Sequence, residues 1–381
     1  MKKIISCFLF LYFSFQLCAQ NDSCNIRVSL LTCTPGLELY STFGHSALRV
    51  VDTANSIDLI YNYGTFDFYD PDFYSKFTRG KLLYFLSVEP MDSFIIGYQY
   101  EKRGITEQLL NLSCDQKKKL LVALEENARE ENKYYKYDFL RDNCTTRLRD
   151  IVEKFSSPPF TTKPIIPGQT TFRKQIHEYL DKSGQYWTEL GIDILLGTPI
   201  DQKLTNREIM FLPEYLLKGF DSTQTGGQDL VIEKNSILQS ALPPETPSLL
   251  SPMLIFSILF FLVTILSFSR KPAIVRALNI FDKIFFFFCG LLSLLILFMW
   301  FMTEHYAARN NFNVLWALPT HLFVLPFSFQ KRWVKIYFRV VFWISLLLLL
   351  TWFFLPQQMN QALFPVVGII FVRSFMISKK R

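Results

Sequence analysis

The stretch Asp142-Asn143-Cys144-Thr145-Thr146 places a cysteine directly behind two good helix N-cap residues. Apolar residues then recur at helical spacing from Leu148 to Phe155, and Pro158-Pro159 ends the pattern. The sequence therefore predicts a helix that begins at Cys144. A thiol in the first turn of a helix lies beside free backbone N–H groups at the positive end of the helix dipole. These groups lower the thiol pKa and can stabilise an oxyanion.

A second stretch, Phe43-Gly44-His45-Ser46, offers a base for this thiol. A histidine and a cysteine far apart in sequence can meet in a fold as a thiolate–imidazolium pair. The alternative is that Cys144 is a small buried residue or a disulfide partner and that His45 is a core histidine. We expect a third residue to orient the imidazole from the following strand, with Asn62 as the candidate and Asp58 as the other choice.

The part of the chain around these stretches predicts a mixed α+β domain. Alternating and β-branched residues predict four strands, at Ile26–Cys33, His45–Asp52, Ile57–Gly64 and Gly80–Val88. Helical periodicity marks Gln116–Asn132, and residues 160–220 are mostly helical. One disulfide is expected among Cys24, Cys33 and Cys114, but the spacing does not say which two residues form it. Neither a zinc-site spacing nor a glycine-rich phosphate loop occurs, so no metal and no cofactor are expected.

The rest of the chain has the apolar segments of a membrane domain. Five apolar segments follow a Pro-rich stretch, at 252–268, 284–302, 312–329, 339–355 and 362–377. Residues 1–19 combine two lysines with a short apolar run and Ala19, which is typical of a signal peptide. We therefore divide the chain into a signal peptide at 1–19, an exported domain at 20–220, a linker at 221–251 and an all-α five-helix transmembrane domain at 252–381.

Charge sets the expected orientation. The net charge is +7, but from residue 252 onward 13 Lys and Arg residues face 2 acidic ones, so the exported part is net negative. This distribution excludes a basic nucleic-acid-binding face. The basic residues of the membrane half gather in alternate loops and at the C-terminus. By the positive-inside rule, the exported domain lies in the periplasm and the C-terminus in the cytoplasm of an inner-membrane protein.

Polar residues at the outer side of the predicted membrane domain are candidates for substrate binding. His305, Asn311 and Asn313 lie at the outer interface, and His321 lies inside the third segment. Ionisable residues at membrane depth are costly and often functional, although His321 could equally serve as an interhelical hydrogen-bonding group.

The order of the two motifs, histidine before cysteine, resembles circularly permuted papain-like (NlpC/P60-like) enzymes, many of which act on lipid acyl chains. The stretches Leu37–Val50, Tyr61–Phe66, Asp142–Arg147 and Asn311–Pro319 are similar to the Lnb family, the lipoprotein N-acyltransferases of Bacteroidetes, over nearly the whole mature chain. The resemblance implies a periplasmic domain joined to five membrane helices, with His45 and Cys144 as the catalytic pair.

The activity that the resemblance implies is transfer of an acyl chain from a membrane phospholipid, through a Cys144 thioester, to the α-amine of diacylglyceryl-cysteine lipoproteins. Two other functions fit the same residues. One is a papain-like cell-wall amidase or endopeptidase, which would need only a tether in the membrane. The other is a non-enzymatic envelope assembly or binding protein in which Cys144 is structural.

Overall fold

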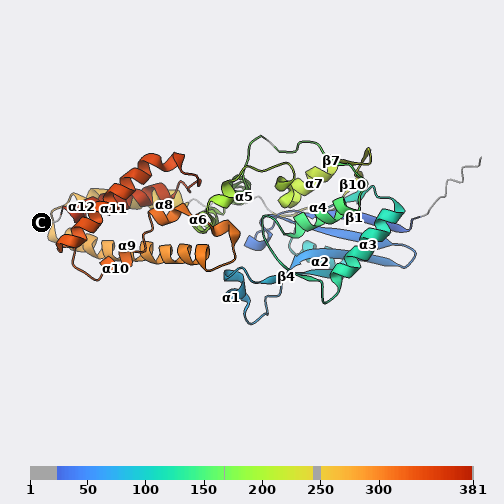
Figure 1. Ribbon diagram of the computed structural model, residues 1–381, viewed down its shortest axis with the longest axis horizontal. Coiled ribbons are helices and arrows are strands. Elements are labelled where there is room, and N and C mark those ends of the chain that lie inside the picture. The colour runs from blue at the N-terminus through green and yellow to red at the C-terminus, as the bar shows by residue number, and fades with distance from the viewer. Residues whose placement is uncertain (1–23, 167, 243–249, 380–381) are drawn as a thin grey trace, which may run out of the picture.

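The computed structural model describes residues 24–166, 168–242 and 250–379. The predicted signal peptide and most of the Pro-rich stretch before the membrane segments lie outside these ranges. A sheet-rich domain and a bundle of apolar helices lie side by side (Figure 1). The α+β class expected for the first domain and the helical class expected for the second are therefore confirmed.

The first domain is organised around one antiparallel sheet whose strands differ in length. Its seven strands have the order β10-β5-β1-β2-β3-β4-β6. They are β1 (Ile26–Cys33), β2 (His45–Asp52), β3 (Ile57–Thr65), β4 (Leu83–Pro90), β5 (Ile105–Leu110), β6 (Tyr134–Lys136) and β10 (Val231–Leu238). A small second sheet has the order β7 (Phe160–Thr162), β8 (Thr223–Thr225), β9 (Gln228–Asp229). β1 and β2 have the bounds that the sequence predicts. β1 is buried at every position except Arg27, and β2 alternates between buried and half-buried residues from Leu48 onward.

Helices cover both faces of the large sheet. α3 (Cys114–Ala128) and α4 (Cys144–Phe155) pack on the face that carries Leu30 and Leu48, and α2 (Met91–Tyr100) covers the face that carries Ala47. The remaining helices of this domain are α1 (Phe73–Thr78), α5 (Phe172–Lys182), α6 (Tyr186–Leu195) and α7 (Pro213–Asp221), with 3-10 turns at η1 (Leu39–Ser41), η2 (Thr198–Asp201) and η3 (Glu208–Phe211). The helix predicted at Cys144 therefore begins at that residue.

Two features of this domain go beyond the sequence analysis: one settles the disulfide pairing, and the other corrects the predicted linker. The disulfide joins Cys24 to Cys114 and ties the start of β1 to the first turn of α3, while Cys33 is a free buried thiol. Residues 221–251 are not simply a linker, because β8, β9 and β10 lie within them and β10 pairs with β5 along the edge of the large sheet. A polar, exposed edge strand carries no apolar alternation, and this is why its sequence reads as a linker.

The second domain contains two helices long and apolar enough to cross a membrane, α9 (Pro272–Phe301) and α11 (Arg332–Thr351) with its 3-10 extension η6 (Trp352–Phe354). Two shorter apolar helices, α8 (Pro252–Ser267) and α12 (Leu363–Ser378), pack beside them. Where α8, α9 and α12 meet, buried Arg373 forms a bidentate ion pair with Asp282 of α9 and also donates to Ser267. The charge of Arg373 is therefore paired within the helical bundle.

The third predicted membrane segment, 312–329, is not a continuous helix. It forms the 3-10 turn η5 (Phe312–Leu315) and the single-turn helix α10 (His321–Val324). Its side chains Asn313, Trp316 and His321 are buried within the protein. Irregular backbone at membrane depth is tolerated where surrounding protein satisfies its polar groups. Within the segment, Asn313 and Pro319 interrupt the helix.

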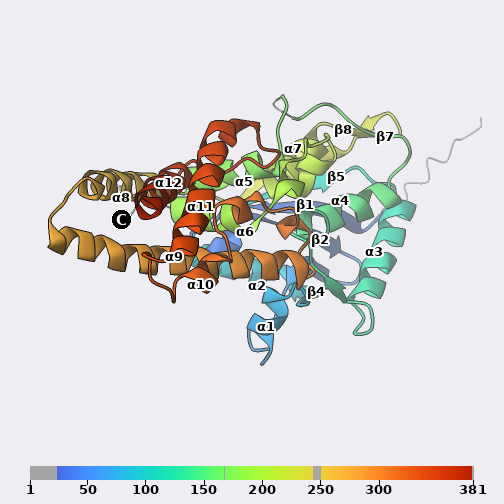
Figure 2. The ribbon, with the colours of Figure 1, turned by 60° about the vertical axis from the view of Figure 1, so that its left-hand side comes forward.

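The two domains are joined by direct contacts at the outer end of α9. The backbone N–H of Glu304 donates to the carbonyl of Arg79, and Nε2 of His305 donates to the carbonyl of Phe77. The outer loop also contains η4 (Tyr306–Ala308), whose Ala307 carbonyl accepts from the N–H of Gly197. Figure 2 shows α1 and α6 against this end of the bundle.

Candidate active site

The strands β2 and β3 separate where the candidate residues lie. β2 and β3 pair with each other only from Asp52↔Ile57 to Leu48↔Tyr61. Residues 45–47 of β2 pair with β1 alone, and residues 62–65 of β3 pair with β4 alone. A fork therefore opens between the two strands. His45 stands at the first position of β2, on one side of the fork, and its Nε2 lies 2.6 Å from Oδ1 of Asn62 on the other side. Nδ1 of the imidazole is thereby left for the thiol.

The structure brings Asn62, and not Asp58, to the histidine. Asp58 forms an ion pair with Arg49 further along the same strands. Both residues lie on the same face of β3, so only the register of the sheet distinguishes them. The amide of Asn62 also approaches Oε1 of Glu89 at 3.5 Å. The sequence candidate thus has the position from which a side chain orients an imidazole.

Cys144 enters the fork from the start of α4. Asn143 is the N-cap of this helix and forms a reciprocal capping box with Thr146. Nδ2 of Asn143 additionally donates to the carbonyls of Phe139 and Phe211, which fix the approach of the helix. The cysteine is therefore the first helical residue, as its sequence predicts.

A glycine makes room for the thiol. Gly64 lies at the β-bulge of β3 with φ of 91°, and a Cβ at this position would lie 3.4 Å from Cβ of Cys144. This backbone conformation and this close approach both favour glycine. An isolated glycine within a strand pattern is the sequence signal that could have identified this position.

The pKa values of Cys144 and His45 are set by burial, by the interaction of the two residues with each other, and by hydrogen bonds to three neighbours, Thr145, Ser46 and Asn62. Burial raises the pKa of Cys144, but the charge of His45 and hydrogen bonds from His45, Thr145 and the backbone N–H of Ser46 outweigh it and lower the pKa to about 7. Burial lowers the pKa of His45, but the Cys144 thiolate and the hydrogen bonds with Cys144 and Asn62 outweigh it, so that pKa is raised. The pair therefore favours thiolate and imidazolium near neutral pH. By contrast, burial raises the pKa of Cys33 to about 12.

A cavity of about 240 Å³ opens beside the imidazole. His45 and Asn62 line one side of it, and α2 lines the other with Ser93 and Tyr98. The arrangement can hold part of a substrate next to a base, with a nucleophile at a helix start. Chemically it fits acyl transfer through a cysteine.

The predicted substrate-binding residues of the membrane half lie elsewhere. Asn311 and Asn313 are buried, and their amide groups donate to the carbonyls of Asp193 and Ile194 at the end of α6. The last carbonyls of a helix lack partners within it, so these amides cap α6 from the membrane domain. His305 lies in the contact with α1, and His321 is buried beside Phe286 and bonded to the hydroxyl of Tyr337. A substrate role for these four residues stays a prediction.

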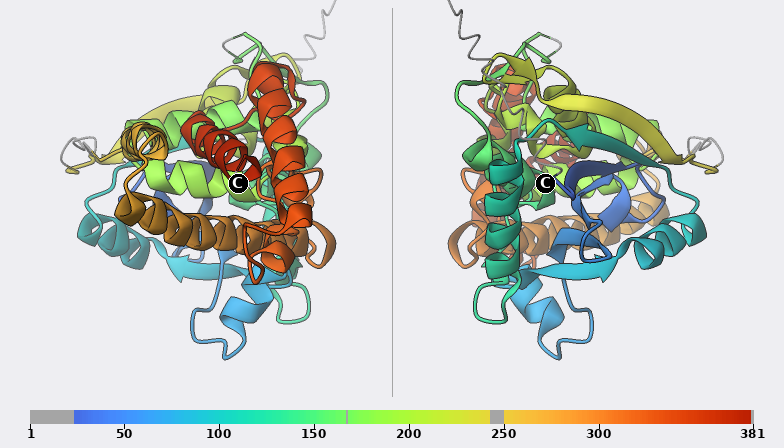
Figure 3. Two further views of the ribbon diagram at one scale, coloured as in Figure 1. Left: turned by 90° about the vertical axis from the view of Figure 1, so that its left-hand side faces the viewer. Right: turned by 90° about the vertical axis from the view of Figure 1, so that its right-hand side faces the viewer.

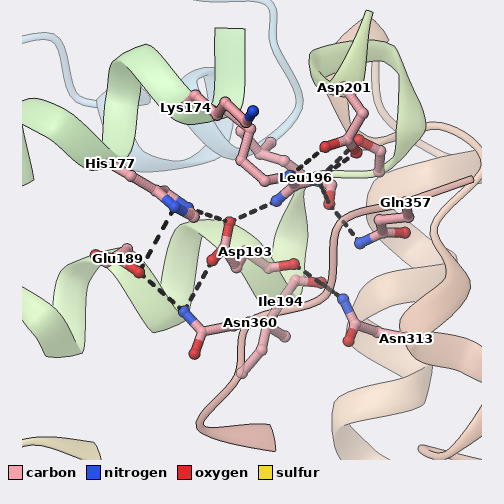
Figure 4. Close-up of polar contacts among 12 residues, drawn as sticks. Lys174, His177, Glu189, Asp193, Ile194, Leu196, Asp201, Asn313, Gln357 and Asn360 are labelled. Atoms are coloured by element: carbon pink, nitrogen blue, oxygen red, sulfur yellow. Dashed lines mark hydrogen bonds and ion pairs between the residues drawn. The ribbon is translucent and has the colours of Figure 1, made fainter. Parts of the chain in front are cut away.

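A polar network that the sequence does not single out completes this junction (Figure 4). Fully buried Arg173 pairs with Asp193 and Asp201, and Asn360 donates to Asp193 and Glu189. Gln357 donates to the carbonyl of Leu196. The bonded partners lie up to 171 residues apart in the sequence, so no local pattern marks them.

One group within this network has the composition of a metal site. His177, Glu189 and Asp193 present ligand atoms within 4.8 Å of one another. The groups already facing Asp193 are hydrogen-bond donors, Arg173 and Asn360, together with Nε2 of His177. The guanidinium would repel a cation there, so the cluster fits an ion-pair network that fastens the domains together.

Comparison with family models assigns both halves of the chain. The Lnb N-terminal periplasmic domain matches residues 15–177, and the Lnb transmembrane domain matches residues 244–381. The first match contains His45, Asn62 and Cys144, and the second contains the whole helical bundle. No curated protein and no solved structure matches the chain. The protein is thus a membrane protein with an N-terminal periplasmic domain, and with both domains matched, the chain belongs to the Lnb family.

Proposed function

We propose that this protein is a lipoprotein N-acyltransferase that uses Cys144 as its nucleophile. Membership of the Lnb family supports an acyltransferase that acts on lipid and lipoprotein substrates in general. The observation that carries the specific mechanism is the position of Cys144, which is the first residue of α4 and bonds with His45 and the N–H of Ser46.

In the first half-reaction, the Cys144 thiolate attacks an ester carbonyl of a phospholipid. A C–S bond forms, the ester C–O bond breaks, and the imidazolium of His45 gives its proton to the departing lysophospholipid oxygen. The backbone N–H of Cys144 stands at the helix start, where it can donate to the oxyanion. Asn62 keeps the imidazole ring in the plane that this transfer needs.

In the second half-reaction, the α-amine of a diacylglyceryl-cysteine attacks the thioester. A C–N bond forms, the C–S bond breaks, and the amine proton passes to His45, which restores the thiolate–imidazolium pair. The free energy of the phospholipid ester is conserved in the thioester, so the reaction uses no ATP or acyl-CoA. This suits a site in the periplasm.

The fold supports a position close to lipid. β1 runs toward the membrane helices, so its C-terminal end and the N-terminal end of the antiparallel β2 face them (Figure 1). His45 is the first residue of β2. The fork therefore opens toward the membrane domain, and two lipid substrates could reach it from the outer leaflet. Proximity of this kind can supply a large part of a barrier, up to ~7–11 kcal/mol in ideal cases.

We also propose that the C-terminus lies in the cytoplasm. In a protein whose native cysteines are replaced, a cysteine at exposed Gln361 should react with an impermeant maleimide from the periplasmic side. A cysteine at Lys379 should react only after lysis. Labelling of both positions in intact spheroplasts would contradict this topology.

The proposed activity is tested by mass spectrometry of lipoprotein N-terminal peptides from cells that lack the gene. Complementation with the native chain should restore the third acyl chain, and Cys144→Ala or His45→Ala should not. Cys289→Ala, which removes a free thiol of α9, is the matched control and should restore it. Triacylated peptides from the Cys144→Ala strain would refute the proposed nucleophile.

A further inference from the structure

A row of aromatic rings runs from the edge of the catalytic domain to the nucleophile. Its members are Phe77, Phe73, Phe66, Tyr84 and Tyr137, which we call the aromatic row. Successive ring centroids are 6.0, 5.9, 5.1 and 4.2 Å apart. Phe77 is half exposed, and Phe66, Tyr84 and Tyr137 are only partly covered. Phe73 is buried, at 8% exposed, so its exposed neighbours Phe77 and Phe68 form the apolar surface at that point.

The outer end of the row lies against the loop that follows α9. The carbonyl of Phe77 accepts from His305, and the carbonyl of Arg79 accepts from the N–H of Glu304, just beyond the outer end of α9. Seen from the side of the membrane domain, α1 projects beyond the outline of the membrane helices (Figure 3, left). In that view no helix of the bundle lies over α1, so a bilayer around the bundle would face it.

The side chains around α1 fit that position. Phe68 is 59% exposed, Tyr69 94% and Tyr74 82%. Exposed aromatic residues in a group are unusual on a surface that faces only water, and aromatic residues gather at the membrane–water interface because their rings are amphipathic.

The inner end of the row lies at the thiol. Tyr84 stacks on Tyr137, and both rings pack against the cluster of buried side chains that includes Cys144. A Cβ at Gly64 would lie 3.7 Å from the ring of Tyr137 and 3.4 Å from Cβ of Cys144. The glycine thus leaves the last ring and the nucleophile facing one small space.

We propose that the aromatic row binds the fatty acyl chain of the lipid donor and leads it from the outer leaflet to Cys144. A chain that leaves the bilayer needs apolar contacts along its whole path, because its exposure to water is unfavourable in proportion to the apolar area. The row supplies such contacts between its two observed ends. This inference rests on the proposed function, since it names the route by which the acyl donor reaches the same site.

The route is tested first without catalysis. The full-length Cys144→Ala protein is reconstituted in nanodiscs that contain a phospholipid with a diazirine in the middle of one acyl chain, and is irradiated. We expect adducts on the peptides that contain Phe66 to Phe77, Tyr84 and Tyr137. Adducts confined to the membrane helices would overturn the proposal. This arm reports on the route even if Cys144 forms no thioester.

The second experiment measures whether acylation of Cys144 depends on the aromatic row. Tyr84→Ser should slow acylation of Cys144 by a long-chain phospholipid at least tenfold more than it slows the reaction with a short-chain, water-soluble ester. Phe85→Ser is the matched control, because Phe85 is the next residue of β4 and lies on the opposite face, against Tyr134. Equal rates for both variants with the long-chain donor would contradict the route. Failure of the native protein to form a thioester with either ester would instead refute the proposed function.

Discussion

The pKa of Cys144 is the property of the site that responds most directly to a single substitution. In the native protein this pKa is about 7, so roughly half of the thiol is ionised at pH 7. The substitution His45→Gln removes the charge and the hydrogen bond that lower it and leaves the burial that raises it. The pKa should return to its ordinary value of 9.0 or rise above it. This change corresponds to about 3 kcal/mol of lost thiolate stabilisation.

The assay is the rate of Cys144 alkylation by iodoacetamide between pH 5 and 10, measured peptide by peptide by mass spectrometry. The native rate should rise through a midpoint near pH 7 because the thiolate is the reacting form. In His45→Gln the midpoint should move above pH 9, while the thiolate fraction at pH 7 falls to about 1%. The rate at pH 7 falls less than this fraction, roughly five- to tenfold, because a more basic thiolate is the stronger nucleophile.

Two controls accompany this titration. Cys33 serves as an internal reference, because its pKa of about 12 keeps it unreactive over most of the range. Asp58→Asn alters a residue of β3 that pairs with Arg49 and not with the histidine, so it should leave the Cys144 midpoint in place. A His45→Gln protein with an unchanged midpoint would refute the thiolate–imidazolium pair.

The other predictions concern how the site is held. Asn143→Ala removes the capping box and two donors to buried carbonyls, so it should lower the free energy of unfolding by about 1–2 kcal/mol, measured by denaturation of the protein in detergent. Asn313→Ala removes the side-chain donor to the Asp193 carbonyl and one of two donors to the Ile194 carbonyl, so it should cost about 1–3 kcal/mol, whereas a residue that acts only on substrate would leave the melting temperature unchanged. Replacing Cys24 and Cys114 with Ser opens a loop of 90 residues and should cost roughly 2–5 kcal/mol; a melting temperature that does not respond to reductant in the native protein would contradict this.

Local patterns predict the parts of this protein that local interactions determine. β1 and β2 have the predicted bounds because their β-branched, apolar composition and the turn after Asp52 are local features. The start of α4 is also local, because Asn143 caps it directly. The choice between Asn62 and Asp58 is not local. It depends on the register Leu48↔Tyr61, which the sequence does not display.

The same distinction explains the corrections. β10 looks like a linker because an exposed edge strand carries no buried alternation. The segment 312–329 is apolar enough for a membrane span, but Asn311 and Asn313 bond to α6 and draw the backbone out of a regular helix. The hydrogen-bonding partners Gln357 and Asn360 can be identified only from the structure, in which the two domains are in contact. A hydropathy profile locates the apolar segments of a chain, but it does not show which polar side chains from distant segments bond to them.

The most direct test of the account is detection of the acyl-enzyme. The purified protein in phospholipid nanodiscs, without an acceptor, should carry one acyl chain on Cys144 that hydroxylamine removes at neutral pH. Addition of a diacylglyceryl-cysteine peptide should discharge this chain and yield the N-acylated peptide in equal amount. Formation of triacylated peptide with no hydroxylamine-sensitive adduct on Cys144 at any time would contradict the account.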